Sequence, residues 1–378
     1  MERIIRLFPA VVTVFLFTAI FSCKKSSPGT GNNNSSGPDS VLINIGNNII
    51  LPSYQSLATT VNSLDSGITD FNSSPDAAKL ANLQTLFKNA YVAWESVSEF
   101  NGFGPASTNQ PLLSSIDLFP VATVKVDSNI IAGSYTVNII SNATAKGFPA
   151  LDYLLFGGGS NTLANYTTDA HAANRKQYLA AVSADIKTEV NAVVTAWSAT
   201  GGNYIHTFTT GTGNSVSSSL GLLINSVDQD LEILKNDRLG IPLGKQPPGT
   251  TLPILPTEVE AYYSGISAQL ALAQLKAIQG IYTGTSANGG ATMGLDNYVV
   301  KANAKYNGGS LSDTVKANFA TAVTELQAIP DPLSATIQSN AGPSDVLYAE
   351  CQKLVVLMKT DMPSSLGVLI TYGDNDGD

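Results

Sequence analysis

The chain has 378 residues, of which 43% are hydrophobic and only 13% are charged, and its formal net charge is −9. An acidic surface repels the phosphates of nucleic acids and the headgroups of anionic lipids, which argues against nucleic acid as a partner and against electrostatic docking on a membrane. The hydrophobic fraction is ample for a large core. The length exceeds what one core usually fills, because single cores stop growing at about 250–300 residues.

The first 22 residues have the pattern of a secretion signal. Arg3 and Arg6 precede an apolar run over residues 7–21, which is too short to span a bilayer comfortably, and Cys23 follows a small residue. We expect a bacterial lipoprotein signal peptide over residues 1–22, with cleavage before Cys23 and a lipid on that cysteine. The protein would then lie outside the cytoplasm, anchored by its lipid in the periplasm or at the outer membrane. An uncleaved anchor is the alternative.

Residues 23–38 are rich in Gly, Ser, Pro and Asn and hold no side chains that could build a core, so we expect a flexible tether. The folded body then begins near Asp39. Because the lipid occupies Cys23, the second cysteine, Cys351, is left without a disulfide partner. Cys351 lies in an apolar helical pattern, which predicts a packing role rather than a nucleophile.

We expect the body to be all-α, because apolar residues recur at steps of three and four along most of it. The first such pattern, within residues 75–100, begins at Ser74 and Pro75, which suit an N-cap and a first turn. Further patterns predict helices over residues 170–197, 216–234, 257–281, 311–329 and 344–362. Strand signals are sparse: residues 121–126 alternate, but no partner strand is evident nearby.

Residues 237–256 are dense in proline and glycine, and a helix cannot cross such a segment. We place the connection between two helical bundles there. The first bundle region covers residues 39–240 and the second covers residues 257–378, and the two regions are free to share helices. The order of helices within each bundle does not follow from the sequence.

Four segments resemble landmarks of the imelysin-like family, which includes proteins of the iron-regulated protein A type. Residues 91–105 resemble the family's early helix, with its Trp-Glu end and Phe-Gly-Pro turn. Residues 147–157 keep the frame of the Gly-x-His-x-x-Glu signature, and residues 234–244 resemble the Lys-x-x-Arg-Ile/Leu-Gly-x-Pro loop. Residues 366–378 resemble the C-terminus common in members from Bacteroidetes. Together, the four segments identify the chain as a member of the family.

The resemblance implies two related four-helix bundles packed side by side, with a functional site between them and an extracytoplasmic role in iron uptake or homeostasis. The family has been classified among the metallopeptidases because of its His-x-x-Glu pair, so the resemblance also raises this activity as a possibility to weigh. Here Gly147 keeps the frame, but Pro149 stands at the His position and Asp152 at the Glu position. Proline cannot coordinate a metal, and catalytic zinc usually needs three protein ligands. We therefore expect no enzymatic activity and assign no catalytic residue.

Asp152 is the one ionisable residue left at the ligand positions of the signature. One interpretation gives it a role as an oxygen ligand or a hydrogen-bond acceptor. In the other, Pro149 starts a helix and Asp152 stabilises the N-terminus of that helix by about 0.3–1 kcal/mol. The sequence leaves both open.

Polar residues near the other landmarks are further candidates for ligand binding. Glu95 and Glu99 are four residues apart and share a predicted helix face with Ser98, so a cation or an arginine would relieve their repulsion. Two solvated carboxylates are the alternative. Arg238, at the predicted bundle boundary, is the best candidate to pair with one of them. Asp117 is either a further oxygen ligand or a turn residue that bonds its own backbone.

Our first hypothesis is a lipid-anchored, non-enzymatic protein that binds a cation or an iron-bearing ligand between the two bundles. A metal ion (iron, zinc or calcium) is the one cofactor that the sequence suggests, and Asp152 and Glu95 are weak candidates to ligate it. Transport proteins of the outer membrane are the expected protein partners. The alternatives are a metallopeptidase of the imelysin type, and a scaffold or interaction protein whose site has degenerated.

Overall fold

The structure is a computed structural model that describes residues 39–105, 112–246, 252–286, 289 and 293–372. The predicted signal peptide, Cys23 and the tether lie outside these residues, as does the end of the chain after Tyr372. Within the described ranges, no helix is both long and apolar enough to cross a membrane. All of them belong to one compact unit, and the division into two bundles stays a prediction.

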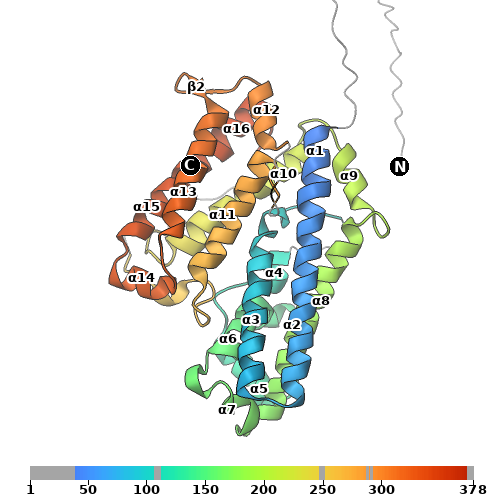
Figure 1. Cartoon of the computed structure of the whole chain (residues 1–378), viewed down its shortest axis with the longest axis vertical. Helices are drawn as coiled ribbons and strands as arrows, with labels where there is room; N and C mark the ends of the chain where they lie inside the picture. Colours follow the sequence, from blue (N-terminus) through green and yellow to red (C-terminus); the bar gives the residue numbers. More distant parts are fainter. Residues whose placement is uncertain (1–38, 106–111, 247–251, 287–288, 290–292, 373–378) are drawn as a thin grey trace, which may run out of the picture. The chain divides into compact units, whose positions relative to one another are not determined.

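Nearly all of the described regular structure is helical, which confirms the predicted all-α fold (Figure 1). The first half of the chain contains α1 (Ser40–Asn44), η1 (Ile45–Ile50), α2 (Leu51–Ser73), α3 (Ala77–Glu95), η2 (Ser98–Phe100), α4 (Leu112–Ile116), α5 (Thr123–Ala132), η3 (Ile140–Ala145), α6 (Gly147–Phe156), η4 (Gly159–Asn161), α7 (Ala164–Thr167) and α8 (Ala172–Trp197). The second half contains α9 (Tyr204–Thr210), α10 (Ser219–Ile233), η5 (Leu234–Gly240), η6 (Pro256–Glu258), α11 (Ser267–Thr283), α12 (Leu295–Lys301), α13 (Leu311–Gln327), α14 (Leu333–Ser339), α15 (Gly342–Val356), η7 (Leu357–Asp361) and α16 (Met362–Leu366). The strands β1 (Lys305–Tyr306) and β2 (Gly309–Ser310) form a short antiparallel hairpin.

Helices α2, α3 and α8 form a first packed group. α2 packs along both α3 and α8, and Figure 1 shows the three running side by side. Buried side chains of α2 recur at steps of three and four between Leu57 and Phe71, which gives the helix one continuous apolar face. The ring of Tyr54 contacts the rings of Phe100 and Trp197 within this core. α6 packs on both α3 and α8.

Helices α11, α13 and α15 form a second group, in which α13 contacts both of the others. α11 also packs against α3 of the first group, and α10 with its continuation η5 contacts α11 and α15. The side chains described below meet where α3, α10, η5 and α11 come together. Cys351 on α15 is buried, as predicted, and burial raises the pKa of its thiol to about 12.

The start of α3 differs from the prediction. Asp76, rather than Ser74, caps the helix, because its side chain accepts a hydrogen bond of 2.8 Å from the backbone amide of Lys79. The alternating pattern over residues 121–126 also does not mark a strand, since most of it lies in helix α5.

The start of α11 is a larger correction. The helix begins at Ser267 rather than at residue 257. Residues 256–266 form the 3-10 turn η6 and a loop in which Ala261 has a φ of +50° and Gly265 a φ of +63°. A right-handed helix cannot continue through left-handed residues. This loop brings an unpredicted carboxylate, Glu260, into the interior.

Candidate functional site

Arg238 is the centre of a buried cluster of polar side chains. It lies in η5, and only 3% of it is exposed. Its Nη2 donates to Glu95 Oε1 at 3.0 Å and its Nη1 donates to Glu95 Oε2, the two-pronged contact typical of arginine and carboxylate. Nη1 also donates to Gln274 Oε1, and Nε lies 3.0 Å from Glu260 Oε2. The expected pair of Arg238 and a helix-end glutamate therefore forms.

Several distant elements bring these side chains together. Glu95 is the last residue of α3, Asp117 follows α4, Glu260 follows η6, and Gln274 lies on α11. The amide of Gln274 donates from Nε2 to the backbone oxygen of Asp230 at 3.1 Å, which ties α11 to α10. Because these residues are far apart in the sequence, the cluster exists only in the folded protein.

Asp117 is held in the cluster by two aromatic residues of α3. Tyr91 Oη donates to its Oδ1 at 2.6 Å, and Trp94 Nε1 donates to its Oδ2 at 2.7 Å. Oδ2 also accepts from Arg238 Nη2 at 3.4 Å. The Asp117 side chain thus faces the cluster, so its interpretation as a turn residue bonded to its own backbone is wrong.

The cluster holds more carboxyl groups than its arginine can balance. Glu95, Asp117 and Glu260 all form ion pairs with the same guanidinium. Burial raises the pKa of Glu95 and of Asp117 well above their usual values; Glu260 adds to both shifts, and Arg238 opposes them. Burial also disfavours the charge of Arg238, but the surrounding carboxylates raise its pKa. Protonation or a further cation must balance the remaining charge.

The donor set of this cluster fits a hard cation. One oxygen from each of Glu95, Asp117 and Glu260 lies within 4.8 Å of the others. Both Glu260 oxygens are buried and accept no hydrogen bond from the described residues. Carboxylate oxygens suit hard cations such as Ca²⁺ and Fe³⁺. No described histidine or cysteine joins the group, so it does not match the ligands of catalytic zinc.

A second pair of carboxylates lies next to this cluster. Glu99 is in η2, beyond the end of α3, so the predicted helix face shared with Glu95 is wrong, and both residues are buried rather than solvated. Ser98 Oγ donates to Asp230 Oδ2 at 3.2 Å. Neither oxygen of Glu99 has a hydrogen-bond partner among the described residues. Burial raises the pKa of Glu99 well above its usual value, and Asp230 adds to the shift.

Asp230 makes the stability of the fold depend on pH. Burial raises its pKa from 3.8 to about 6, with Arg238 in partial opposition. The folded state therefore holds this proton more tightly than the unfolded chain does, so stability present at low pH is lost as the pH rises through about 6, by up to about 3 kcal/mol. We expect Asp230→Asn to flatten this fall, as measured by urea denaturation across the range. Asp313→Asn, at a side chain that is 78% exposed, should not, and equal profiles for both variants would contradict the assignment.

Asp152 lies outside the Arg238 cluster and holds the turn that carries Glu260. It is buried on α6, and its Oδ2 and Oδ1 accept hydrogen bonds of 2.9 Å from the backbone amides of Tyr263 and Ser264. The first turn of α6 contains no acidic residue, so the interpretation of Asp152 as a helix-terminus charge is wrong. Burial raises its pKa to about 6. Its role as a hydrogen-bond acceptor is the predicted alternative that these contacts favour.

Gly147 and Pro149 shape the start of α6. Gly147 has a φ of +75°, and a Cβ built there would lie 2.2 Å from the backbone oxygen of Ile116. This close approach sets α6 directly against the residue that precedes Asp117. Pro149 lies in the first turn of α6, where a proline does not interrupt the helix.

We expect Gly147→Ala to lower the free energy of unfolding by about 3 kcal/mol, because it adds backbone strain and a clash with Ile116. The matched control is Gly159→Ala. Gly159 also has a positive φ, of +53°, but a Cβ there would meet nothing within 4 Å, so about 1 kcal/mol is expected. Thermal and urea unfolding measure both. If Gly147→Ala lowers the free energy of unfolding no more than Gly159→Ala does, the contact between Gly147 and the backbone of Ile116 is not tight.

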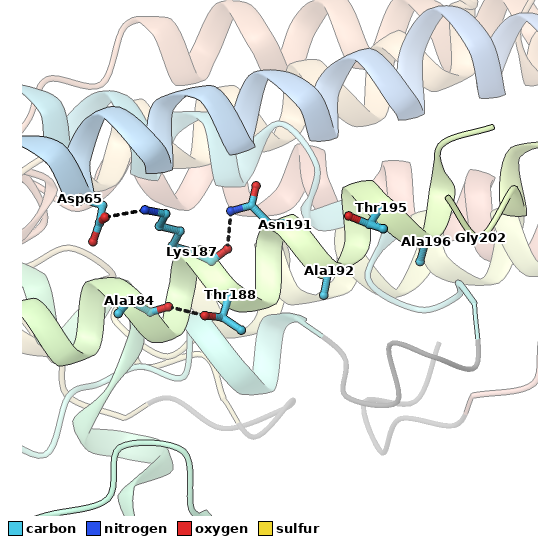
Figure 2. Close-up of a pocket in the computed structure, with 9 residues that line it drawn as sticks. All are labelled: Asp65, Ala184, Lys187, Thr188, Asn191, Ala192, Thr195, Ala196 and Gly202. Atoms are coloured by element: carbon cyan, nitrogen blue, oxygen red, sulfur yellow. Dashed lines mark hydrogen bonds and ion pairs between the residues drawn. The ribbon is translucent and has the colours of Figure 1, made fainter. Parts of the chain in front are cut away.

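The groove in Figure 2 is a separate feature of the surface. It runs along α8 beside Asp65 of α2 and has a volume of about 790 Å³. Most of its lining side chains are small and neutral, such as Ala184 and Ala192, and its ion pair joins Lys187 to Asp65 at 2.8 Å. Because its carboxylate is already paired, the groove offers no group of donors comparable with the Arg238 cluster.

Sequence patterns do not reveal three members of the cluster: Glu260, Gln274 and Asp230. Glu260 falls within a predicted helix, where an exposed position is natural for a glutamate. For Asp230 a signal does exist, since Asp228, Asp230 and Glu232 lie among the apolar residues of α10, where all three are buried. Acidic residues that interrupt a strongly apolar helix indicate a buried polar cluster.

Comparison with known proteins agrees with the resemblance seen in the sequence. A family model described as Imelysin matches residues 50–359. The iron-regulated protein A of Synechococcus elongatus is 22% identical over 309 residues, which cover 80% of this chain and 79% of that protein. A crystal structure of an iron-regulated protein A precursor from Parabacteroides distasonis has a TM-score of 0.69 at 16% identity and covers 88% of this chain and 97% of that one. An imelysin-like protein from Psychrobacter arcticum has a TM-score of 0.65 at 19% identity, with coverage of 88% and 96%.

Proposed function

Because the chain belongs to the imelysin family, we propose that it serves iron uptake or homeostasis outside the cytoplasm by binding a cation, without catalysing a reaction. The name of the relative from Synechococcus elongatus supports the link to iron. The signal pattern before Cys23 supports a lipid anchor in the periplasm or at the outer membrane. Transport proteins of that membrane are the partners we propose.

One observation carries the proposal: three buried carboxylates surround a single guanidinium. One oxygen of each carboxylate lies within 4.8 Å of the other two, a spacing at which one cation can contact all three residues. Buried negative charge is unfavourable unless it is paired, and binding a cation removes this cost. Glu260 is the first ligand we assign, because its oxygens accept no hydrogen bond from the described residues, although Oε2 is ion-paired with Arg238. Glu95 and Asp117 complete the set.

Calorimetric titration of the full chain with Fe³⁺, Fe²⁺, Zn²⁺ and Ca²⁺ tests this proposal. We expect at least one of these ions to bind, and Glu260→Gln to weaken its affinity at least about tenfold, because a neutral amide replaces a carboxylate ligand. Affinity should also fall as the pH is lowered. Glu95 and Asp117 have raised pKa values, so they take up protons that compete with the cation.

The control variant is Asp313→Asn, which removes an exposed carboxylate outside the cluster and should leave the affinity unchanged. Circular dichroism checks that each variant is folded. Binding that survives both Glu260→Gln and Glu95→Gln would place the cation elsewhere. If the folded wild-type chain binds none of the four ions, the proposal is wrong. Cleavage of a peptide that a chelator abolishes would instead favour the metallopeptidase alternative.

A further inference from the structure

A cavity lies beside Asp152 and the turn that carries Glu260. It has a volume of about 280 Å³ and is bounded by residues 119–121 and 123, by Pro149 and Asp152 of α6, and by residues 257–259 and 261–263. Pockets for drug-sized ligands usually measure about 300–1,000 Å³, so this cavity suits a small molecule. It is distinct from the Arg238 cluster, none of whose side chains lines it.

The charge of the cavity favours cations. Asp152 and Glu258 contribute carboxyl groups, and the described lining contains no lysine, arginine or histidine. Lys88 acts on the charge of Asp152 but does not line the cavity. Both Asp152 oxygens already accept backbone hydrogen bonds, whereas Glu258 is partly exposed and can meet a ligand directly. A concave site whose charged side chains are all negative attracts cations and repels anions.

Aromatic side chains give the cavity a second means of holding a cation. The rings of Tyr262 and Tyr263 lie 5.2 Å apart at an angle of 79°. Tyr262 is 39% exposed, and Phe119 belongs to another wall of the same cavity. The faces of aromatic rings attract ammonium groups, by about 0.5–1 kcal/mol at exposed sites. Metal ions gain little from such walls, so the combination favours an organic cation.

Pro149 completes the apolar part of the lining. At this position the family signature has a histidine, which can ligate a metal or carry a positive charge. Proline does neither, and its ring offers an apolar surface for a carbon skeleton. The substitution therefore removes a group that would compete with an organic cation and leaves a surface that can pack against one.

We propose that this cavity binds a small organic cation, a primary or quaternary ammonium, with its charge beside Glu258 and its carbon skeleton against Tyr262 and Pro149. The proposal does not rest on cation binding at the Arg238 cluster. It gives the signature segment a ligand that its substituted residues suit better than a metal ion.

Three probes with one carbon skeleton test the proposal: phenethylammonium, 2-phenylethanol and phenylacetate, which are cationic, neutral and anionic. Binding to the full chain is followed by saturation-transfer NMR and by calorimetry. We expect phenethylammonium to bind about tenfold more tightly than the alcohol, and phenylacetate to bind most weakly. Glu258→Gln should weaken the ammonium about fivefold and leave the alcohol unchanged. Tyr262→Ala should weaken the ammonium about threefold.

Asp313→Asn is the matched control, since it removes one carboxylate far from this lining and should change none of the affinities. Equal affinities for the three probes, a preference for the ammonium that survives Glu258→Gln, or the absence of binding by all three would each overturn the proposal. Metal titration of the same samples reports on the Arg238 cluster separately. Loss of one kind of binding with the other intact therefore shows which of the two proposals has failed.

Discussion

Replacement of Arg238 by alanine is expected to lower the free energy of unfolding by about 3–5 kcal/mol near neutral pH. The guanidinium forms ion pairs with Glu95, Asp117 and Glu260, and all four side chains are buried. Without it, three carboxyl groups face one another away from water with no positive charge among them. Urea denaturation followed by circular dichroism measures the loss.

The matched control is Arg175→Ala. Arg175 also faces a carboxylate, Asp127, but at 3.7 Å and with 14% of the arginine and 40% of the aspartate side chain exposed, so a smaller loss of about 1 kcal/mol is expected. The loss at Arg238 should shrink near pH 5, because Glu95 and Asp117 have raised pKa values and need no cation once protonated. If both variants lose the same free energy of unfolding, or if the loss in Arg238→Ala does not change with pH, packing rather than charge determines the effect.

The long helices in which apolar residues recur clearly at steps of three and four are predictable from the sequence. α8 covers Ala172–Trp197 against a prediction of 170–197, and α13 covers Leu311–Gln327 against 311–329. α2 is not predicted, although its buried residues have the same spacing. Its other positions are rich in Ser and Thr, with two Asn and one Gly; these residues are weak helix formers, and they make the apolar period hard to detect. The packing of its apolar face on α3 and α8 overrides that weak local preference.

The candidate site is only half predictable, and the loop before α11 shows why. Arg238 and Glu95 belong to recognisable segments, and their pairing follows from charge. Glu260 cannot be placed in the same way, because residues 257–281 have a helical pattern throughout. The chain turns at Ala261, which has a positive φ, and the side chain of Asp152, distant in the sequence, binds the amides of Tyr263 and Ser264 in the same loop. An alanine in this conformation carries no signal that a sequence pattern can detect.

The signature segment shows which of the roles left open by the sequence the structure favours. From the sequence, Asp152 is an oxygen ligand or a hydrogen-bond acceptor, or else a charge at the N-terminus of a helix. In the folded protein both of its oxygens are taken by the backbone amides of Tyr263 and Ser264. Two hydrogen bonds to one carboxylate hold the turn on which Glu260 sits, so we expect Asp152 to act on the Arg238 cluster through the backbone. Gly147 lies at the other end of the segment. Because it has no side chain, the backbone of Ile116 can approach it closely, and Asp117 is the next residue after Ile116.

We expect Asp152→Ala to lower the free energy of unfolding by about 2–3 kcal/mol, because it leaves two partly buried backbone amides without their charged acceptor. Asp152→Asn should cost less, since its amide keeps one acceptor oxygen for either Tyr263 or Ser264. Urea denaturation near neutral pH, where a carboxyl group with a pKa of about 6 is ionised, gives both values.

If Asp152 stabilises only the amides of Tyr263 and Ser264, its replacement should not affect Arg238. If the turn held by Asp152 also positions Glu260, the replacement should change the surroundings of Arg238 as well. NMR of the guanidinium of Arg238 distinguishes these outcomes. In the wild type its Nε lies 3.0 Å from Glu260 Oε2, and release of the turn should move that carboxylate away and shift the Nε–H resonance. The matched variant Asp185→Asn removes a largely buried carboxylate paired with Lys146, outside the turn, and should leave this resonance in place. An unchanged Arg238 signal in folded Asp152→Ala would mean that Glu260 is held by the cluster alone.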